Sequence, residues 1–149
     1  MNDLLALKGV ALVATILGLA MAALWLAVTQ GFTTFLTPSP ETTVEQFLRA
    51  LQAGRYPAAR DQLDERLRRT TSVDDLRTLA DLLERRRGGI RHVRDAETRR
   101  DHETRVRVVV AFGDGTATPV EFPLRQEHGL WRIASIGGLQ NLVARDPVR

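Results

Sequence analysis

An uninterrupted apolar run near the N-terminus constrains this chain more than any other feature. Residues Gly9–Val28 contain no charged side chain. At about 1.5 Å of rise per residue, a helix of this length spans roughly 30 Å, the thickness of the hydrocarbon core of a bilayer. The run is apolar on every side, so it cannot lay a single face on a small soluble core. We therefore predict that residues 1–29 form an anchor in which Gly9–Val28 crosses the membrane.

A cleaved signal peptide is the competing interpretation of the same run. The segment Ala20–Ala22 has the small-x-small pattern of a cleavage site. The apolar residues continue to Val28, however, so cleavage after Ala22 would leave an apolar new terminus, and we prefer the uncleaved anchor. Lys8 precedes the run and the next basic residue is Arg49. The positive-inside rule then places the N-terminus in the cytoplasm and the remainder of the chain outside it.

A stripe of small residues lies within the predicted span. Ala14, Gly18 and Ala22 recur at every fourth position, a spacing typical of closely packed membrane helices. Alanine and glycine are common throughout this segment, so its composition alone accounts for the stripe. A dimer formed through these residues is therefore the less favoured interpretation.

Three helices are predicted after an uncharged linker, residues 30–39. Ser39 followed by Pro40 marks the start of the first, and Gly54 marks its end. A second helix is expected to end at about Arg69, and a third is expected between Ser72 and Gly88–Gly89. Apolar residues recur at helical spacing in all three: Val44, Phe47, Leu48 and Leu51, then Ala59, Leu63 and Leu67, then Leu76, Leu79, Leu82 and Leu83.

From Ile90 onward the pattern alternates with the period of a β-strand. Four strands are predicted, separated by turns rich in glycine, aspartate and histidine: residues 90–98, 103–112, 116–127 and 130–136. The third carries Pro119 and Pro123, and proline cannot donate to a β-ladder, so this strand should be bulged or lie at an edge. Residues 138–149 are expected to form a partly loose tail.

Helices followed by strands predict an α+β domain over residues 40–137, with three helices packed on one face of a four-stranded antiparallel sheet. The charged residues of this domain are mixed in sign. The formal net charge of the chain is +3, and arginine supplies nearly all the positive charge. Because a nucleic-acid binder concentrates positive charge on one face, we expect no nucleic-acid partner.

Two segments resemble the nuclear transport factor 2-like superfamily. Pro40–Arg60 reads PETTVEQFLRALQAGRYPAAR and is similar to the first helical corner of those domains. Gln126–Ile133 reads QEHGLWRI and is similar to their last hairpin. The chain most resembles small bacterial members of unknown function that carry an N-terminal anchor. This resemblance implies a cone-shaped α+β domain with a pocket between a curved sheet and the helices, but no single activity.

Four residues are candidates for lining such a pocket: Tyr56, His92, Asp95 and Trp131. The resemblance implies a structural role for Tyr56 at the helical corner. Nothing in the sequence ties the other three together, and the histidines lack acidic partners at metal-ligand spacing. An aromatic residue between Leu130 and Ile133 is more often part of a core than of a ligand site. We therefore expect no catalytic residue, no metal and no cofactor.

The function expected from the sequence is non-catalytic binding, by an extracytoplasmic membrane-anchored domain, of a protein partner or a small apolar ligand. One alternative is an assembly or scaffold component of an envelope or secretion complex. The other is an isomerase-like enzyme that uses the cone pocket. A pocket plugged by Phe47, Phe112, Phe122 and Trp131 would favour a scaffold, whereas a deep apolar pocket with an inward acid would favour an enzyme or ligand binder.

Overall fold

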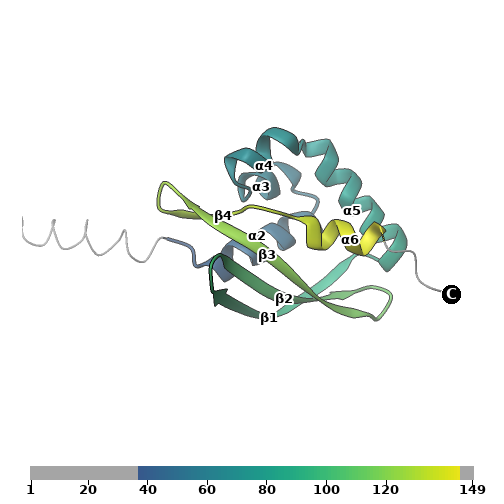
Figure 1. Cartoon of the computed structure of the whole chain (residues 1–149). Helices are drawn as coiled ribbons and strands as arrows, with labels where there is room; N and C mark the ends of the chain where they lie inside the picture. The colour runs from purple at the N-terminus through teal and green to yellow at the C-terminus, as the bar shows by residue number, and fades with distance from the viewer. Residues whose placement is uncertain (1–36, 145–149) are drawn as a thin grey trace, which may run out of the picture. The chain divides into compact units, whose positions relative to one another are not determined.

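The computed structural model describes residues 37–144, which form an α+β domain (Figure 1). The described helices lie mainly before the sheet in the sequence, and one follows it. In chain order the elements are α2 (Pro40–Gln52), α3 (Tyr56–Asp61), α4 (Glu65–Thr70), α5 (Val73–Arg87), β1 (Ile90–Arg100), β2 (Thr104–Phe112), β3 (Ala117–Glu127), β4 (Leu130–Ile133) and α6 (Gly137–Ala144). The predicted fold class is therefore confirmed at the level of α+β, but with five described helices instead of three.

Helix α2 begins and ends where the sequence predicts. The hydroxyl oxygen of Ser39 accepts a hydrogen bond from the backbone N–H of Thr42 at 3.2 Å, and Pro40 occupies the first turn. These features satisfy a free N–H at the helix start and preset its backbone angle. One face is buried, including Val44, Phe47, Leu48 and Leu51.

The second predicted helix is instead two short helices, α3 and α4. Between them, the carbonyl of Gln62 accepts a hydrogen bond from the N–H of Ile133 in β4 at 2.9 Å, and the N–H of Asp64 donates to the carbonyl of Ile133 at 2.8 Å. Leu63 therefore pairs with Ile133 as a parallel bridge. Because those backbone groups serve the edge of the sheet, they cannot continue a helix. Asp64 then starts α4 by accepting a 2.7 Å hydrogen bond from Leu67 N–H.

Helix α5 is bounded by the predicted signals. Ser72 and Asp75 form a reciprocal capping box at its start. Gly88 ends it with a φ of 70°, a left-handed conformation that glycine adopts without strain. A Cβ on Gly88 would lie only 2.9 Å from the carbonyl carbon of Gly113, so glycine also allows the end of α5 to pack against the turn between β2 and β3.

The four strands form an antiparallel sheet in the order β1-β2-β3-β4. The β1–β2 register shifts between Arg94 and Glu97, where Asp95 has a φ of 56°. The β3–β4 hairpin turns through His128 and Gly129, both with positive φ, as a two-residue connection requires. The strands thus agree with those predicted to within two residues at each end, except that β4 ends at Ile133 instead of residue 136.

The two prolines of β3 lie in a strand that is central in the sheet and pairs with β2 in unbroken register, so the prediction of a bulged or edge strand is wrong for β3 as a whole. Strand β4 pairs only with residues 124–127, and the carbonyl of Pro123 accepts one further hydrogen bond from Ala134. By the period of a strand, the backbone of Pro119 faces the same side, beyond the end of the ladder. Residues 117–122 therefore have no β4 partner on that side, where a missing N–H donor is tolerated.

Helix α6 contradicts the expectation of a loose tail after residue 137. Leu139 is fully buried and joins the core. Gly137 and Gly138, which follow the last predicted strand, open this helix, and a Cβ on Gly138 would lie 2.8 Å from a methyl of Val120. Glycine therefore permits α6 to approach β3 closely.

The predicted span Gly9–Val28, its cleavage site at Ala22, the small-residue stripe and most of the linker lie outside the described residues. Among residues 37–144, the helices are too short or too polar to cross a bilayer.

Candidate functional site

Aromatic side chains pack into the core between the sheet and the helices of the described domain. Phe47 of α2 and Phe122 of β3 are both fully buried, with ring centroids 6.1 Å apart in an edge-to-face arrangement. Phe112 is 3% exposed, and Trp131 packs against this core while remaining partly exposed. The aromatic residues expected to plug an interior pocket therefore pack into or against the core.

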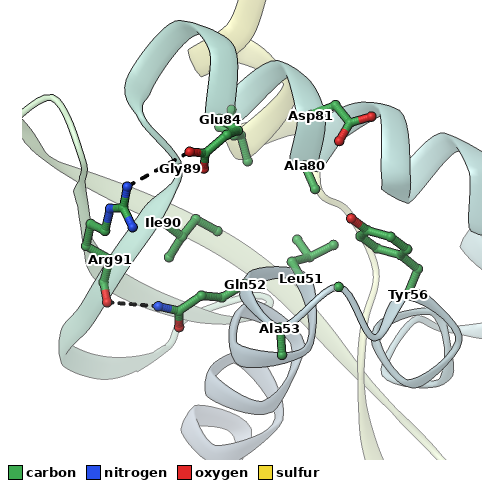
Figure 2. A pocket seen from close by; sticks show the side chains of 12 residues that line it. Leu51, Gln52, Ala53, Tyr56, Ala80, Asp81, Glu84, Gly89, Ile90 and Arg91 are labelled. Carbon is green, nitrogen blue, oxygen red and sulfur yellow. Dashed lines mark hydrogen bonds and ion pairs between the residues drawn. The ribbon is translucent and has the colours of Figure 1, made fainter.

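A cleft lies outside this core, where the end of α2, the second half of α5 and the start of β1 meet (Figure 2). Its volume is about 530 Å³, within the size range of small-molecule sites. The Gly54 turn after α2 and the Gly88–Gly89 turn after α5 bring these three elements together at one place. We treat this recess, the α2–α5 cleft, as the candidate site.

The α2–α5 cleft has an apolar floor and a polar rim. Leu51, Leu83 and Ile90 belong to the core and form the floor. The rim carries five polar side chains, drawn in Figure 2: Gln52, Tyr56, Asp81, Glu84 and Arg91. An apolar floor with a few convergent polar groups is the usual composition of a binding site.

Long-range contacts position the rim. The Gln52 side-chain amide donates to the carbonyl of Arg91 at 3.1 Å and so ties α2 to β1. A guanidinium nitrogen of Arg91 lies 3.9 Å from a carboxylate oxygen of Glu84, a loose ion pair between exposed side chains. On the other side, the guanidinium of Arg77 stacks over the ring of Tyr56 at 5.6 Å, which holds that ring in place.

The charges of the rim favour a positively charged group. Asp81 and Glu84 are one helical turn apart on α5, and Arg91 offsets only one of their charges. The C-terminal end of α2, where carbonyl oxygens carry partial negative charge, lines the opposite wall. An amine or guanidinium with an apolar stem would match both the rim and the floor.

Both carboxylates of the cleft are exposed, with the Glu84 side chain at 65%. The arrangement can recognise a ligand by its charge and shape.

The four residues predicted from the sequence do not converge. Tyr56 alone lines the α2–α5 cleft. His92 is exposed in a recess along β1 and the β2–β3 turn, and Asp95 is exposed at the β1 bulge, 4.0 Å from Arg94. Trp131 lines a separate, open recess with His102 and Arg125.

Sequence reasoning missed Gln52, Asp81, Glu84 and Arg91. A local signal was present on α5, because Asp81 and Glu84 have the spacing of neighbours on one helix face. Gln52 and Arg91 had no such signal, since they come together only when the end of α2 packs beside the start of β1.

Comparisons with known proteins support the fold. No protein-family model matches the sequence, and a comparison with curated proteins finds no match. Among solved structures, the chain is similar to a protein described as an NTF2-like transpeptidase from Campylobacter jejuni, with a TM-score of 0.52 and 17% identity, over 65% of this chain and 98% of that one. It is also similar to a SEC-C motif-containing protein from Rhodopseudomonas palustris, with a TM-score of 0.53 and 16% identity, over 66% and 77% of the two chains.

Likeness at this level of identity concerns the fold alone. The NTF2-like fold expected from Pro40–Arg60 and Gln126–Ile133 is thus supported. Kinship with the small membrane-anchored members of that superfamily stays a prediction.

Proposed function

We propose that this chain is a single-span membrane protein whose domain, residues 38–144, binds a protein partner without catalysis, through the α2–α5 cleft. The observation that carries the proposal is the filled space between sheet and helices, where Phe47 and Phe122 are in contact. An apolar ligand in that space would have to displace a ring that already makes equivalent contacts. A surface cleft needs no such rearrangement.

The cleft favours a side chain of a partner over a free apolar molecule. Its floor is small, and its rim presents a hydroxyl, an amide, a guanidinium and two carboxylates. These groups leave hydrogen-bonding capacity unused when an apolar ligand binds, which lowers affinity. A lysine or arginine from a partner would place its aliphatic stem on Leu51 and Ile90 and its charge beside Glu84.

Site-specific photocrosslinking tests this proposal in membranes of the cells that make the protein. A photoreactive amino acid replaces Gln52 at the rim in one full-length variant and Ala58 in another. Ala58 is an exposed residue of α3 outside the cleft and serves as the matched control. We expect a discrete protein adduct from position 52 and none from position 58.

Charge removal then tests the chemistry of the rim. The double change Asp81→Asn and Glu84→Gln keeps the shape of the cleft and removes two exposed charges. If each charged contact contributes up to about 1 kcal/mol, the adduct should fall roughly five- to twenty-fold. Equal adducts from positions 52 and 58 would overturn the proposal, and so would an adduct at position 52 whose added mass is that of a small molecule.

A further inference from the structure

The face of the sheet that points away from the helices carries most of the arginines of the strands. The buried residues of β2 and β3 are all even-numbered, so the odd-numbered residues form the outer face. The register places Arg99 of β1 directly opposite Arg105 of β2, and Arg125 of β3 directly opposite Arg132 of β4. Arg105 faces Pro123, two positions from Arg125, so the four side chains form one band across the sheet, called here the arginine row.

Like charges placed directly opposite each other on neighbouring strands destabilise a sheet. The arginine row contains two such pairs, and other groups of the domain neutralise their repulsion only in part. Arg105 lies 3.4 Å from Glu103, and Arg132 donates to the carbonyl of Asp61 at 2.7 Å. Within residues 37–144, the side chains of Arg99 and Arg125 are exposed and form no hydrogen bond or ion pair.

The neighbouring row of the same face is balanced. Arg107 lies between Glu97 on β1 and Glu121 on β3, an arrangement of alternating charges. Excess positive charge is therefore local to the end of the sheet that includes the β3–β4 hairpin, and an anion at this end would relieve the repulsion within the arginine row.

An exposed apolar side chain lies at the same end. Leu130, the first residue of β4, is 36% exposed and is the large hydrophobic residue that the described domain leaves most open to solvent. Strand alternation places it on the same face as Arg132. The register partner of Leu130 on β3 is Glu127, whose carboxylate accepts a hydrogen bond from the backbone of Glu65. The four guanidinium groups next to this tip outnumber the carboxylates of Glu103 and Glu127, and together with the leucine they match a surface that is anionic outside and apolar just beneath.

We propose that the arginine row and Leu130 dock the domain on the anionic phospholipid headgroups of a bilayer. Guanidinium groups bind phosphate oxygens with two parallel hydrogen bonds, and Leu130 would enter the headgroup boundary. This inference rests on the proposed membrane anchor, because residues 30–39 reach at most about 35 Å and so keep the domain close to the bilayer. The tether and the exposed leucine favour a lipid surface over a soluble anion.

The chain contains no cysteine, so one introduced thiol reports on a chosen position. The full-length His128→Cys variant carries a fluorophore at the hairpin tip and is reconstituted into vesicles of phosphatidylcholine alone or with 30% phosphatidylglycerol, both containing a lipid-attached nitroxide quencher. We expect stronger quenching in the anionic vesicles, falling towards the phosphatidylcholine value as salt is raised from 0.05 to 0.5 M.

Two matched double variants identify the residues responsible. Arg99→Gln with Arg125→Gln should shift the docking equilibrium by roughly tenfold or more, since each arginine near an anionic surface contributes about a factor of five. Arg55→Gln with Arg85→Gln removes the same charge from exposed positions outside the arginine row and should leave quenching unchanged. Equal quenching in both lipids, or equal loss in both variants, would overturn the inference.

Failure of the anchor is distinguished from failure of docking by alkaline extraction of the same vesicles. A chain that is extracted lacks the anchor and overturns the proposed membrane function. A chain that resists extraction but shows no lipid-dependent quenching overturns only the docking surface.

Discussion

Replacing Phe122 with alanine tests whether the space between sheet and helices is truly filled. The side chain is fully buried, and its ring meets Phe47 edge-to-face at 6.1 Å. A buried phenylalanine removes at least about 150 Å² from water, which corresponds to roughly 4 kcal/mol at about 25 cal/mol per Å². Truncations of this kind cost about 3–5 kcal/mol once the remaining cavity and the lost aromatic pair are included. We expect Phe122→Ala to lower the free energy of unfolding by this amount.

Urea unfolding of the full-length chain in nanodiscs measures the effect. Trp131 packs against the core and reports the transition in a Trp25→Phe background that removes the other tryptophan. Phe122→Leu fills most of the space and should cost about 1–1.5 kcal/mol, and Glu121→Ala, an exposed neighbour on the same strand, should cost less than about 0.5 kcal/mol.

The outcome bears directly on function. If Phe122→Ala lowers the free energy of unfolding by less than about 1 kcal/mol, and the slope of that free energy against urea concentration is unchanged, then removal of the ring creates little new cavity and the interior is already open. A surface site would then no longer be favoured over an interior one. If the packing is as described, the alanine variant should also acquire weak saturable binding of benzene-sized ligands that the wild-type chain lacks, because an apolar cavity left dry accepts such molecules.

Three further outcomes follow from local geometry. Asp64→Ala removes the buried N-cap of α4 and should cost about 1–2 kcal/mol in urea unfolding, whereas Asp64→Asn keeps the acceptor and should cost less. Gly88→Ala places a Cβ 2.9 Å from Gly113 and should destabilise more than Gly115→Ala, which shares a positive φ but has open space around it. The backbone N–H and the hydroxyl of Ser72, the N-cap of α5, hold the pKa of Asp75 below its ordinary value. The ionised Asp75 therefore stabilises the folded state at neutral pH, and this stabilisation is lost as pH falls through the folded-state pKa. Asp75→Asn should therefore flatten the acid limb of a melting-temperature profile, and an unchanged limb would contradict the assignment.

Structural features that depend on only a few neighbouring residues were predicted correctly. Ser39 and Ser72 begin helices, and Gly88 ends one, because each satisfies or frees backbone groups within its own turn. The strand period predicted from Ile90 onward is seen in β2, where Val106, Val108 and Val110 are buried, since a strand with one buried face repeats every second residue.

Features that depend on distant partners were missed. The break between α3 and α4 exists because Leu63 pairs with Ile133, seventy positions later. The Asp64–Glu65 sequence is a helix-start signal that would have revealed the break, had the segment not been read as one helix. Helix α6 was missed because Gly137 and Gly138 stop a strand in local terms, while their role in packing α6 on Val120 is visible only in three dimensions.

The candidate site was only partly predictable for the same reason. Tyr56 was predicted to have a structural role at the helical corner and to be a candidate for an interior pocket; it lines the α2–α5 cleft, which is a different site. Arg91 and Gln52 are joined by a hydrogen bond that spans 39 positions, so neither has a neighbour in the sequence that marks it. His92 and Asp95 were candidates because they lie on a predicted strand, yet both are exposed.

Because the interior is filled, the rim residues that we propose bind a partner differ from the aromatic residues that stabilise the fold. In a domain with an open central pocket, the side chains that line the pocket also form the core, so changes that alter binding also alter stability. Here Phe47 and Phe122 are fully buried, whereas Asp81 and Glu84 are exposed. Exposed carboxylates contribute little to stability, so Asp81→Asn with Glu84→Gln should leave the urea midpoint nearly unchanged while it reduces partner crosslinking. If the urea midpoint fell together with crosslinking, the rim side chains would be part of the packing of the domain. The cleft would then not be a separate binding site.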